Sequence, residues 1–168
     1  MSSRLFGVVL CFLTLLLLSS AGFAQEGFAP PPQIPYGLSI DIDGARTVAA
    51  AAVAEARTNG WNMAIAIVDT GGHLVYFEKM DDTQIGSVQV SIDKARSAAL
   101  YRRPTKVFED GLAQGGQGIR LLRLEGAMPV DGGVPIIVDD KVVGGIGISG
   151  GSGAQDGEVA HVGADAVN

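Results

Sequence analysis

Two pairs of apolar segments, each pair joined by a turn of a few residues, constrain the fold of this chain most strongly. The first pair spans residues 63–69 and 74–79 around Thr70-Gly-Gly-His73, and the second spans residues 134–138 and 142–149 around Asp139-Asp140-Lys141. Strands joined by such short turns pair antiparallel, because a parallel pair needs a long crossover connection. Residues 63–68 are all apolar, which is typical of a central strand covered on both faces. The sequence therefore predicts an antiparallel sheet.

Segments with helical spacing of apolar residues flank these hairpins. They are expected to run from a cap at Asp41 or Asp43 to Asn59-Gly60, from about Ser87 to Tyr101, briefly after Thr105, and from about Ala154 onward. In the second helix, the predicted buried stripe consists of Val88, Ile92, Ala95 and Ala99. Residues 114–118 are expected to form a loop, and residues 119–124 fit either a strand or a helix. Amphipathic helices packed on an antiparallel sheet define an α+β fold.

The N-terminal 24 residues have the three parts of a secretory signal peptide. Arg4 precedes an apolar stretch over residues 5–18, and small residues lead to an expected cleavage site after Ala24. The apolar stretch is shorter than the roughly 20 residues that a membrane span needs, so no span is expected once the signal is removed. We therefore expect a secreted or periplasmic protein. Residues 25–37 are rich in proline and indicate a tether, which leaves residues 38–168 as the folded domain.

Cysteine content and charge exclude several classes of function. The one cysteine, Cys11, lies within the predicted signal, so the mature chain is expected to have no disulfide and no thiolate ligand or nucleophile. Eighteen acidic residues against 12 basic residues give a net charge of −6. Binding to nucleic acid depends on neutralising phosphates with Lys and Arg, so we expect no nucleic-acid partner.

Three short motifs each allow a functional and a structural interpretation. Gly145-Ile-Gly147-Ile-Ser-Gly150 matches the glycine pattern of dinucleotide-binding turns, but such glycines also occur where a strand packs closely on another backbone. Asp69-Thr-Gly71 matches the motif of aspartic proteases, and turn chemistry explains it equally well. Lys94 and Arg96 begin a local basic cluster that suits small anions, with Gly147 and Gly150 as further anion contacts, although surface charge balance is the alternative.

Five ordered segments of the domain resemble one protein family. They are Val68-Asp-Thr-Gly-Gly-His-Leu-Val75, Lys79-Met-Asp-Asp82, Ser91-Ile-Asp-Lys-Ala-Arg-Ser-Ala-Ala99, Gly132-Gly-Val-Pro-Ile136, and Val143-Gly-Gly-Ile-Gly-Ile-Ser-Gly-Gly151 followed by Gln155-Asp156. With these segments, residues 38–167 are similar to the GlcG/HbpS family of haem-binding proteins, which is related to the C-terminal domain of the corrinoid adenosyltransferase PduO.

The resemblance implies a profilin-like α/β/α sandwich, in which helices cover both faces of the antiparallel sheet. It also implies an exported, homo-oligomeric protein that binds haem or iron. It leaves open whether haem is carried, slowly degraded, or sensed together with a membrane partner. The alternative function is a small enzyme or binding module for a carboxylate or aldehyde metabolite. No residue is assigned a catalytic role, and the sequence favours a binding protein over an enzyme.

The resemblance assigns no ligand to the haem iron, so the candidates come from side-chain chemistry. Neutral imidazole is the commonest protein ligand of haem iron, which makes His161 the first candidate, His73 the second and the Met80 thioether a third. Glu158 and Asp165 share a helical face with His161, where either carboxylate could orient the imidazole ring or help to hold a metal. Glu78 and Asp81, on either side of Lys79, are candidates for binding iron at the surface.

Overall fold

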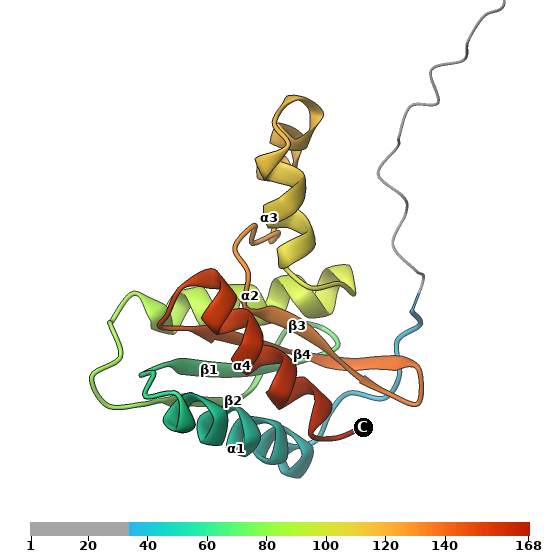
Figure 1. Ribbon diagram of the computed structural model, residues 1–168. Helices are drawn as coiled ribbons and strands as arrows, with labels where there is room; N and C mark the ends of the chain where they lie inside the picture. Colours follow the sequence, from blue (N-terminus) through green and yellow to red (C-terminus); the bar gives the residue numbers. More distant parts are fainter. Residues whose placement is uncertain (1–33) are drawn as a thin grey trace, which may run out of the picture. The chain divides into compact units, whose positions relative to one another are not determined.

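The computed structural model describes residues 34–168, so the predicted signal peptide and residues 25–33 of the tether lie outside the described residues. It confirms the α+β fold with a four-stranded antiparallel sheet in the order β2-β1-β4-β3 (Figure 1). The strands are β1 (Ala64–Asp69), β2 (Leu74–Lys79), β3 (Gly133–Val138) and β4 (Lys141–Ser149). Both predicted hairpins are present, as β1–β2 and β3–β4.

The register of β1 explains its apolar sequence. Ala64 lies opposite Lys79 of β2 and opposite Ser149 of β4, so β1 has a hydrogen-bonded neighbour on each side. Five of its six residues are buried, and only Asp69 at its end is partly exposed. The prediction of a central strand covered on both faces is confirmed.

Helices α1 (Ile42–Thr58) and α4 (Gly153–Asp165) cover one face of the sheet (Figure 1). The Asp41 side chain caps α1 by accepting a hydrogen bond from Gly44 N at 2.8 Å, as one of the two predicted caps. Ser152 and Gln155 form a capping box at the start of α4. The buried apolar residues of both helices join the main core, which includes Val48, Ala52, Ile65, Ile67, Ile146, Ile148 and Val159.

Helix α2 (Ser87–Tyr101) covers the opposite face, which completes the expected sandwich. Its bounds match the prediction, but its buried face differs. Val88 and Ile92 are only partly buried, whereas serines and one lysine are buried with the alanines: Ser87, Ser91, Lys94, Ala95, Ser97, Ala98 and Ala99. A Cβ atom on Gly145 would lie 2.5 Å from Ala95 O, and one on Gly147 would collide with Ser91 O. Because β4 approaches the α2 backbone so closely, small residues fill the interface, and the close-packing interpretation of these glycines is confirmed.

Between α2 and β3 the chain forms α3 (Lys106–Ala113) and the 3₁₀ helix η1 (Gly116–Arg123), which extend away from the sheet in Figure 1. Residues 119–124, which fitted strand or helix, are therefore mostly helical, and η1 begins within the stretch expected to be a loop. Three large apolar residues here are exposed: Ile119, Leu122 and Leu124.

The last residues of the predicted tether contact the domain. Gly37 N donates to Val142 O and Val142 N donates to Pro35 O, so this stretch pairs with the start of β4. The Tyr36 hydroxyl donates to Leu100 O at 2.9 Å, and Arg102 lies over the Tyr36 ring. Residues 34–37 are thus bound to the fold. Within the described residues, no helix has the length and apolarity to cross a membrane.

Candidate functional site

Two hollows on the surface of the domain carry polar side chains, and they share no lining residue. The first, which we call the α2 groove, has a volume of about 390 Å³. It lies between one exposed face of α2 and the segment that follows η1, and it is lined by Asp93, Arg96, Leu100, Glu125, Gly126, Ala127 and Met128. It thus combines a guanidinium group, an aliphatic side chain and a thioether, together with two carboxylates.

Hydrogen bonds to α2 hold the second wall of the α2 groove in place. The Tyr101 hydroxyl donates to Glu125 O at 2.7 Å, and Met128 N donates to Ser97 Oγ at 3.0 Å. Both ends of the 125–128 segment are therefore tied to the helix that forms the opposite wall. A groove built in this way needs little rearrangement to accept a ligand.

The β1–β2 turn adjoins the α2 groove and carries His73. Gly72, in a left-handed conformation with φ of 79°, faces the helix so closely that a Cβ there would lie 3.5 Å from Leu100 Cδ1 and 3.6 Å from Arg96 Cγ. His73 follows directly, and 83% of its side chain is exposed. The backbone of the turn at Gly72 thus lies beside two lining residues of the groove, and His73 is the next residue in the chain.

Asp69 organises this turn and orients the His73 ring. Its Oδ1 accepts hydrogen bonds from Gly71 N and His73 N, both at 2.8 Å, and its Oδ2 lies 3.1 Å from His73 Nδ1. These bonds confirm the turn interpretation of Asp69-Thr-Gly71 over the protease interpretation. Because Nδ1 faces the carboxylate, Nε2 is the nitrogen left for a ligand, as in histidines that bind metals.

The same contacts set the ionisation of Asp69. Desolvation raises the pKa of this carboxyl group, but hydrogen bonds from the backbone and ring of His73 and from Gly71 N outweigh it, and the pKa falls below its ordinary value. Asp69 is therefore a carboxylate at neutral pH, which suits an acceptor that holds an imidazole N–H.

His161 and the two carboxylates predicted to share its helical face all belong to α4. Glu158, His161 and Asp165 lie exposed on α4, and none of the three lines either hollow. No group of three or more His, Cys, Asp or Glu side chains within residues 34–168 is arranged to hold a metal ion. Among the described residues, a carboxylate contact to an imidazole is found at His73, from Asp69.

The remaining candidates for iron are not gathered at a common site. Met80 is half-buried and packs against the main core. The Glu78 carboxylate accepts a hydrogen bond from the Tyr76 hydroxyl at 3.1 Å, and this bond raises the pKa of Tyr76. Asp81 is exposed at the turn after β2.

Lys94 is buried, whereas the sequence suggests either a contact for small anions or a charge on the surface. Only 1% of its side chain is exposed, and its Nζ donates to Asp156 Oδ2 at 2.7 Å and to Ile148 O at 3.0 Å. It is therefore closed to an anion from solution and is no surface charge, and Arg96 is the exposed member of the predicted anion contacts. Gly147 faces α2, and Gly151 N already donates to Asp156 Oδ1. Of the residues on which the metabolite alternative rested, Lys94 and Gly147 are thus used within the fold, whereas Arg96 is exposed and Gly150 lines the second hollow.

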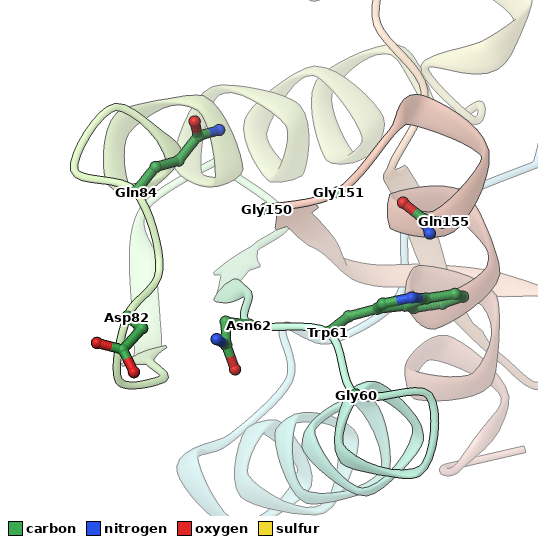
Figure 2. Close-up of a pocket in the computed structure, with 8 residues that line it drawn as sticks. All are labelled: Gly60, Trp61, Asn62, Asp82, Gln84, Gly150, Gly151 and Gln155. Atoms are coloured by element: carbon green, nitrogen blue, oxygen red, sulfur yellow. The ribbon is translucent and has the colours of Figure 1, made fainter.

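The second hollow, the Trp61 pocket, has a volume of about 360 Å³. Figure 2 shows Trp61 and Gln155 on one side, Asp82 and Gln84 on the other, and Asn62, Gly150 and Gly151 between them, with Gly60 below. Of these residues, the sequence indicates only Gly150 as a candidate site residue, although Asp82, Gly151 and Gln155 belong to the segments that resemble the family. A lone tryptophan directly after a predicted helix end at Asn59-Gly60 is the signal that could have drawn attention to this place.

An antiparallel sheet enclosed by α1 and α4 on one face and α2 on the other defines a small α/β/α sandwich. The chain belongs to the HbpS-like family, described as 'Haem degrading protein HbpS-like', and the model of this family matches residues 40–165. The resemblance inferred from the five sequence segments is thereby confirmed.

Known proteins agree with this assignment. The chain is 40% identical to Protein GlcG of Escherichia coli strain K12 over 105 residues, which are 62% of this chain and 77% of GlcG. The crystal structure of HbpS matches with a TM-score of 0.72 and 27% identity, covering 81% of this chain and 95% of HbpS. The crystal structure of a PduOC:heme complex matches with a TM-score of 0.70 and 26% identity, covering 78% and 96% of the two chains.

Proposed function

We propose that this protein binds haem at the α2 groove, with His73 as the ligand of the iron. The observation that carries the proposal is the His73 imidazole, which Asp69 orients and which follows Gly72, the turn residue that lies beside Arg96 and Leu100 of the groove. The haem-related family and the relative that was crystallised with haem support the same ligand.

The groove and the adjoining β1–β2 turn offer three kinds of contact that suit haem. Leu100 and Met128 provide apolar surface for the porphyrin, and the Arg96 guanidinium suits the propionate groups. His73 Nε2 would hold the iron, while Asp69 accepts the Nδ1–H and makes the ring more basic. When bound, the haem supplies an iron centre with redox and ligand-binding chemistry.

Within haem-related functions, we propose carrying or exchange of haem. The groove is open and His73 is mostly exposed, which favours transfer to and from another molecule. Degradation would favour a closed site from which water is excluded. Haem is here a cargo, so a sensory partner that receives it remains compatible with this proposal.

We further propose that the protein is exported and self-associates. Residues 1–24 have the pattern of a secretory signal, which supports a secreted or periplasmic location. The apolar side chains of Ile119, Leu122 and Leu124 are each exposed, which supports contact with a second copy in this part of the chain. Mass spectrometry of the exported chain and light scattering of the purified protein check these two points.

Titration with haemin tests the proposed ligand. The wild-type chain should give a saturable shift of the Soret band, and His73→Ala should abolish the spectrum of a coordinated iron. His161→Ala is the matched control, since it removes the other histidine of the chain from an exposed helical position. Asp69→Asn should weaken haem affinity about 10-fold to 100-fold, because the ring loses its carboxylate partner.

The outcomes separate the two histidines. Loss of coordination in His161→Ala with an unchanged His73→Ala would return the assignment to α4. A coordinated spectrum that persists in the double variant, with the fold confirmed by circular dichroism, would show that neither imidazole binds the iron.

A further inference from the structure

The polar side chains of the Trp61 pocket are fixed by bonds on their inner side. Gln155 Oε1 accepts from Ser152 N at 2.8 Å, which leaves its Nε2 donor group for the pocket. Gln84 Nε2 donates to Ser87 Oγ at 3.0 Å, and Ser87 Oγ also accepts from Ser149 Oγ at 3.0 Å. Gln84 therefore presents its Oε1 acceptor. The two amides lie on opposite sides of the pocket (Figure 2), and the atoms that these bonds do not use are a donor on Gln155 and an acceptor on Gln84.

Two glycines form the backbone between these amides, where the packing leaves no room for a side chain. A Cβ atom on Gly150 would lie 2.8 Å from Met63 Cα, and one on Gly151 would lie 2.7 Å from Gln155 Oε1. Gly151 N donates to Asp156 Oδ1 at 2.9 Å, and Asp156 is itself fixed by the buried Lys94. The backbone that separates the two walls is therefore rigid and carries no side chain.

Charge narrows the class of ligand for the Trp61 pocket. Asp82 is the one charged residue among those that line it, and no lysine or arginine is present there to receive an anion. Haem propionates, phosphates and carboxylates are thus poor ligands for this pocket. The Trp61 indole, which is partly buried against the main core, adds the rest of its aromatic surface and one N–H donor.

We propose that the Trp61 pocket binds a small neutral polyhydroxylated molecule, of the size and chemistry of a monosaccharide. Each hydroxyl group both donates and accepts a hydrogen bond, so adjacent hydroxyls match the separated donor of Gln155 and acceptors of Gln84 and Asp82. The C–H face of a sugar ring matches the aromatic surface of Trp61. A volume of about 360 Å³ lies within the range of small-molecule sites.

The chain offers a specific reporter for this pocket, because Trp61 is its only tryptophan. Tryptophan fluorescence of the mature protein should change saturably on titration with one or more of D-glucose, D-galactose, D-mannose and N-acetyl-D-glucosamine. D-Glucuronate tests an anion of similar shape, and choline tests whether Trp61 and Asp82 instead select a cation. Both should bind more weakly than the best neutral sugar.

Two variants change the hydrogen-bonding groups while keeping the local backbone. Gln155→Glu preserves the capping box of α4, since Glu serves there as well as Gln, but replaces the Nε2 donor by an acceptor. Asp82→Asn removes the charge at a position with φ of 62°, a conformation that Asn tolerates. Each should weaken sugar binding about tenfold or more, which corresponds to the loss of one strong hydrogen bond.

Arg96→Ala is the matched control, because it removes a charged side chain from the α2 groove and leaves the Trp61 pocket unchanged. It should keep the sugar response in full while altering haem binding, so the two proposals fail separately. A lack of any saturable fluorescence change up to 100 mM of each sugar would overturn the inference. So would equal affinity in wild type and Gln155→Glu, or tighter binding of choline or D-glucuronate than of every sugar.

Discussion

Asp131 is nearly buried at the junction of α3, α4 and the loop before β3, with 9% of its surface exposed. Its Oδ1 accepts from Gly132 N at 2.7 Å, and its own N donates to Glu109 Oε2 at 2.7 Å. Burial raises the pKa of the Asp131 carboxyl group above its ordinary value. The hydrogen bond from Gly132 N and the charges of Lys106 and His161 lower it by less. The ionised form is therefore less favourable in the folded state than in the unfolded chain.

Asp131→Asn should consequently raise the free energy of unfolding at pH 7. Because the folded pKa is raised, ionisation of the wild-type carboxyl group opposes folding at every pH above that pKa. The opposition fades as pH falls through the folded pKa and then through the unfolded value near 3.8, so the advantage of Asn should fade in the same window. Urea unfolding at pH 7 and at pH 3 measures this difference. A constant difference between variants at both pH values would contradict the expectation.

The roles of some residues in the site can be predicted from the sequence, whereas the roles of others cannot. The turn at Asp69-Thr-Gly71 follows from residue type, since Asp and Gly have defined turn chemistry. The hydrogen bond between Asp69 and His73 cannot be inferred from residue type, because the rotamer of His73 is fixed only in the folded turn. Helical spacing instead indicates His161 as the histidine with carboxylate neighbours. Lys94 shows the same limit, since its partner Asp156 is 62 residues away in the chain.

At the scale of elements, the contact of α2 with β4 depends on glycine. Gly147 faces the α2 backbone so closely that a Cβ there would overlap Ser91 O and lie within 3.0 Å of the Ala95 methyl group. The serines and alanines of the buried face of α2 are the matching surface. Because both partners are backbone, neither can move aside without displacing the helix from the sheet.

Gly147→Ala should therefore destabilise the fold by about 1–3 kcal/mol or more. Gly86→Ala is the matched control, because Gly86 has a φ of −60° and no atom lies within 4 Å of the added Cβ. The control should change the free energy of unfolding by less than about 1 kcal/mol, with a contribution from reduced flexibility of the unfolded chain. Thermal and urea unfolding of both variants measure the contrast. Equal stabilities would show that α2 adapts to the extra methyl group.

The elements themselves were largely predictable, because their signals are local. Both hairpins and the bounds of α2 follow from short turns and apolar spacing, and Asp41 was one of two caps proposed for α1. The buried face of α2 could not be predicted in the same way. Polar Ser87 and Ser91 are buried because β4 packs closely on α2, and this packing exists only once the two elements have folded together. The form of residues 119–124 also stayed open, since short apolar runs suit strands and helices alike.

At the scale of the whole molecule, one ion pair joins the two helical layers. Lys94 extends from α2 and Asp156 belongs to α4, which lie on opposite faces of the sheet, and their side chains meet beside Ile148 near the end of β4. Asp156 also accepts from Gly151 N, so the pair connects both layers with one wall of the Trp61 pocket. The exposed fractions of the two side chains are 1% and 4%, so solvent screens their attraction little.

Removing either partner should destabilise the protein strongly, because the remaining charge stays buried without its counter-ion. Lys94→Met and Asp156→Asn are each expected to lower the free energy of unfolding by about 3–5 kcal/mol. The double variant has no buried charge at this place, so its loss should be smaller than the sum of the two single losses by about 1–3 kcal/mol. Urea unfolding of the four proteins at pH 7 completes this double-mutant cycle. Strictly additive losses would show that Lys94 and Asp156 are held by their other hydrogen bonds, to Ile148 O and Gly151 N, and that their mutual contact does not join the layers.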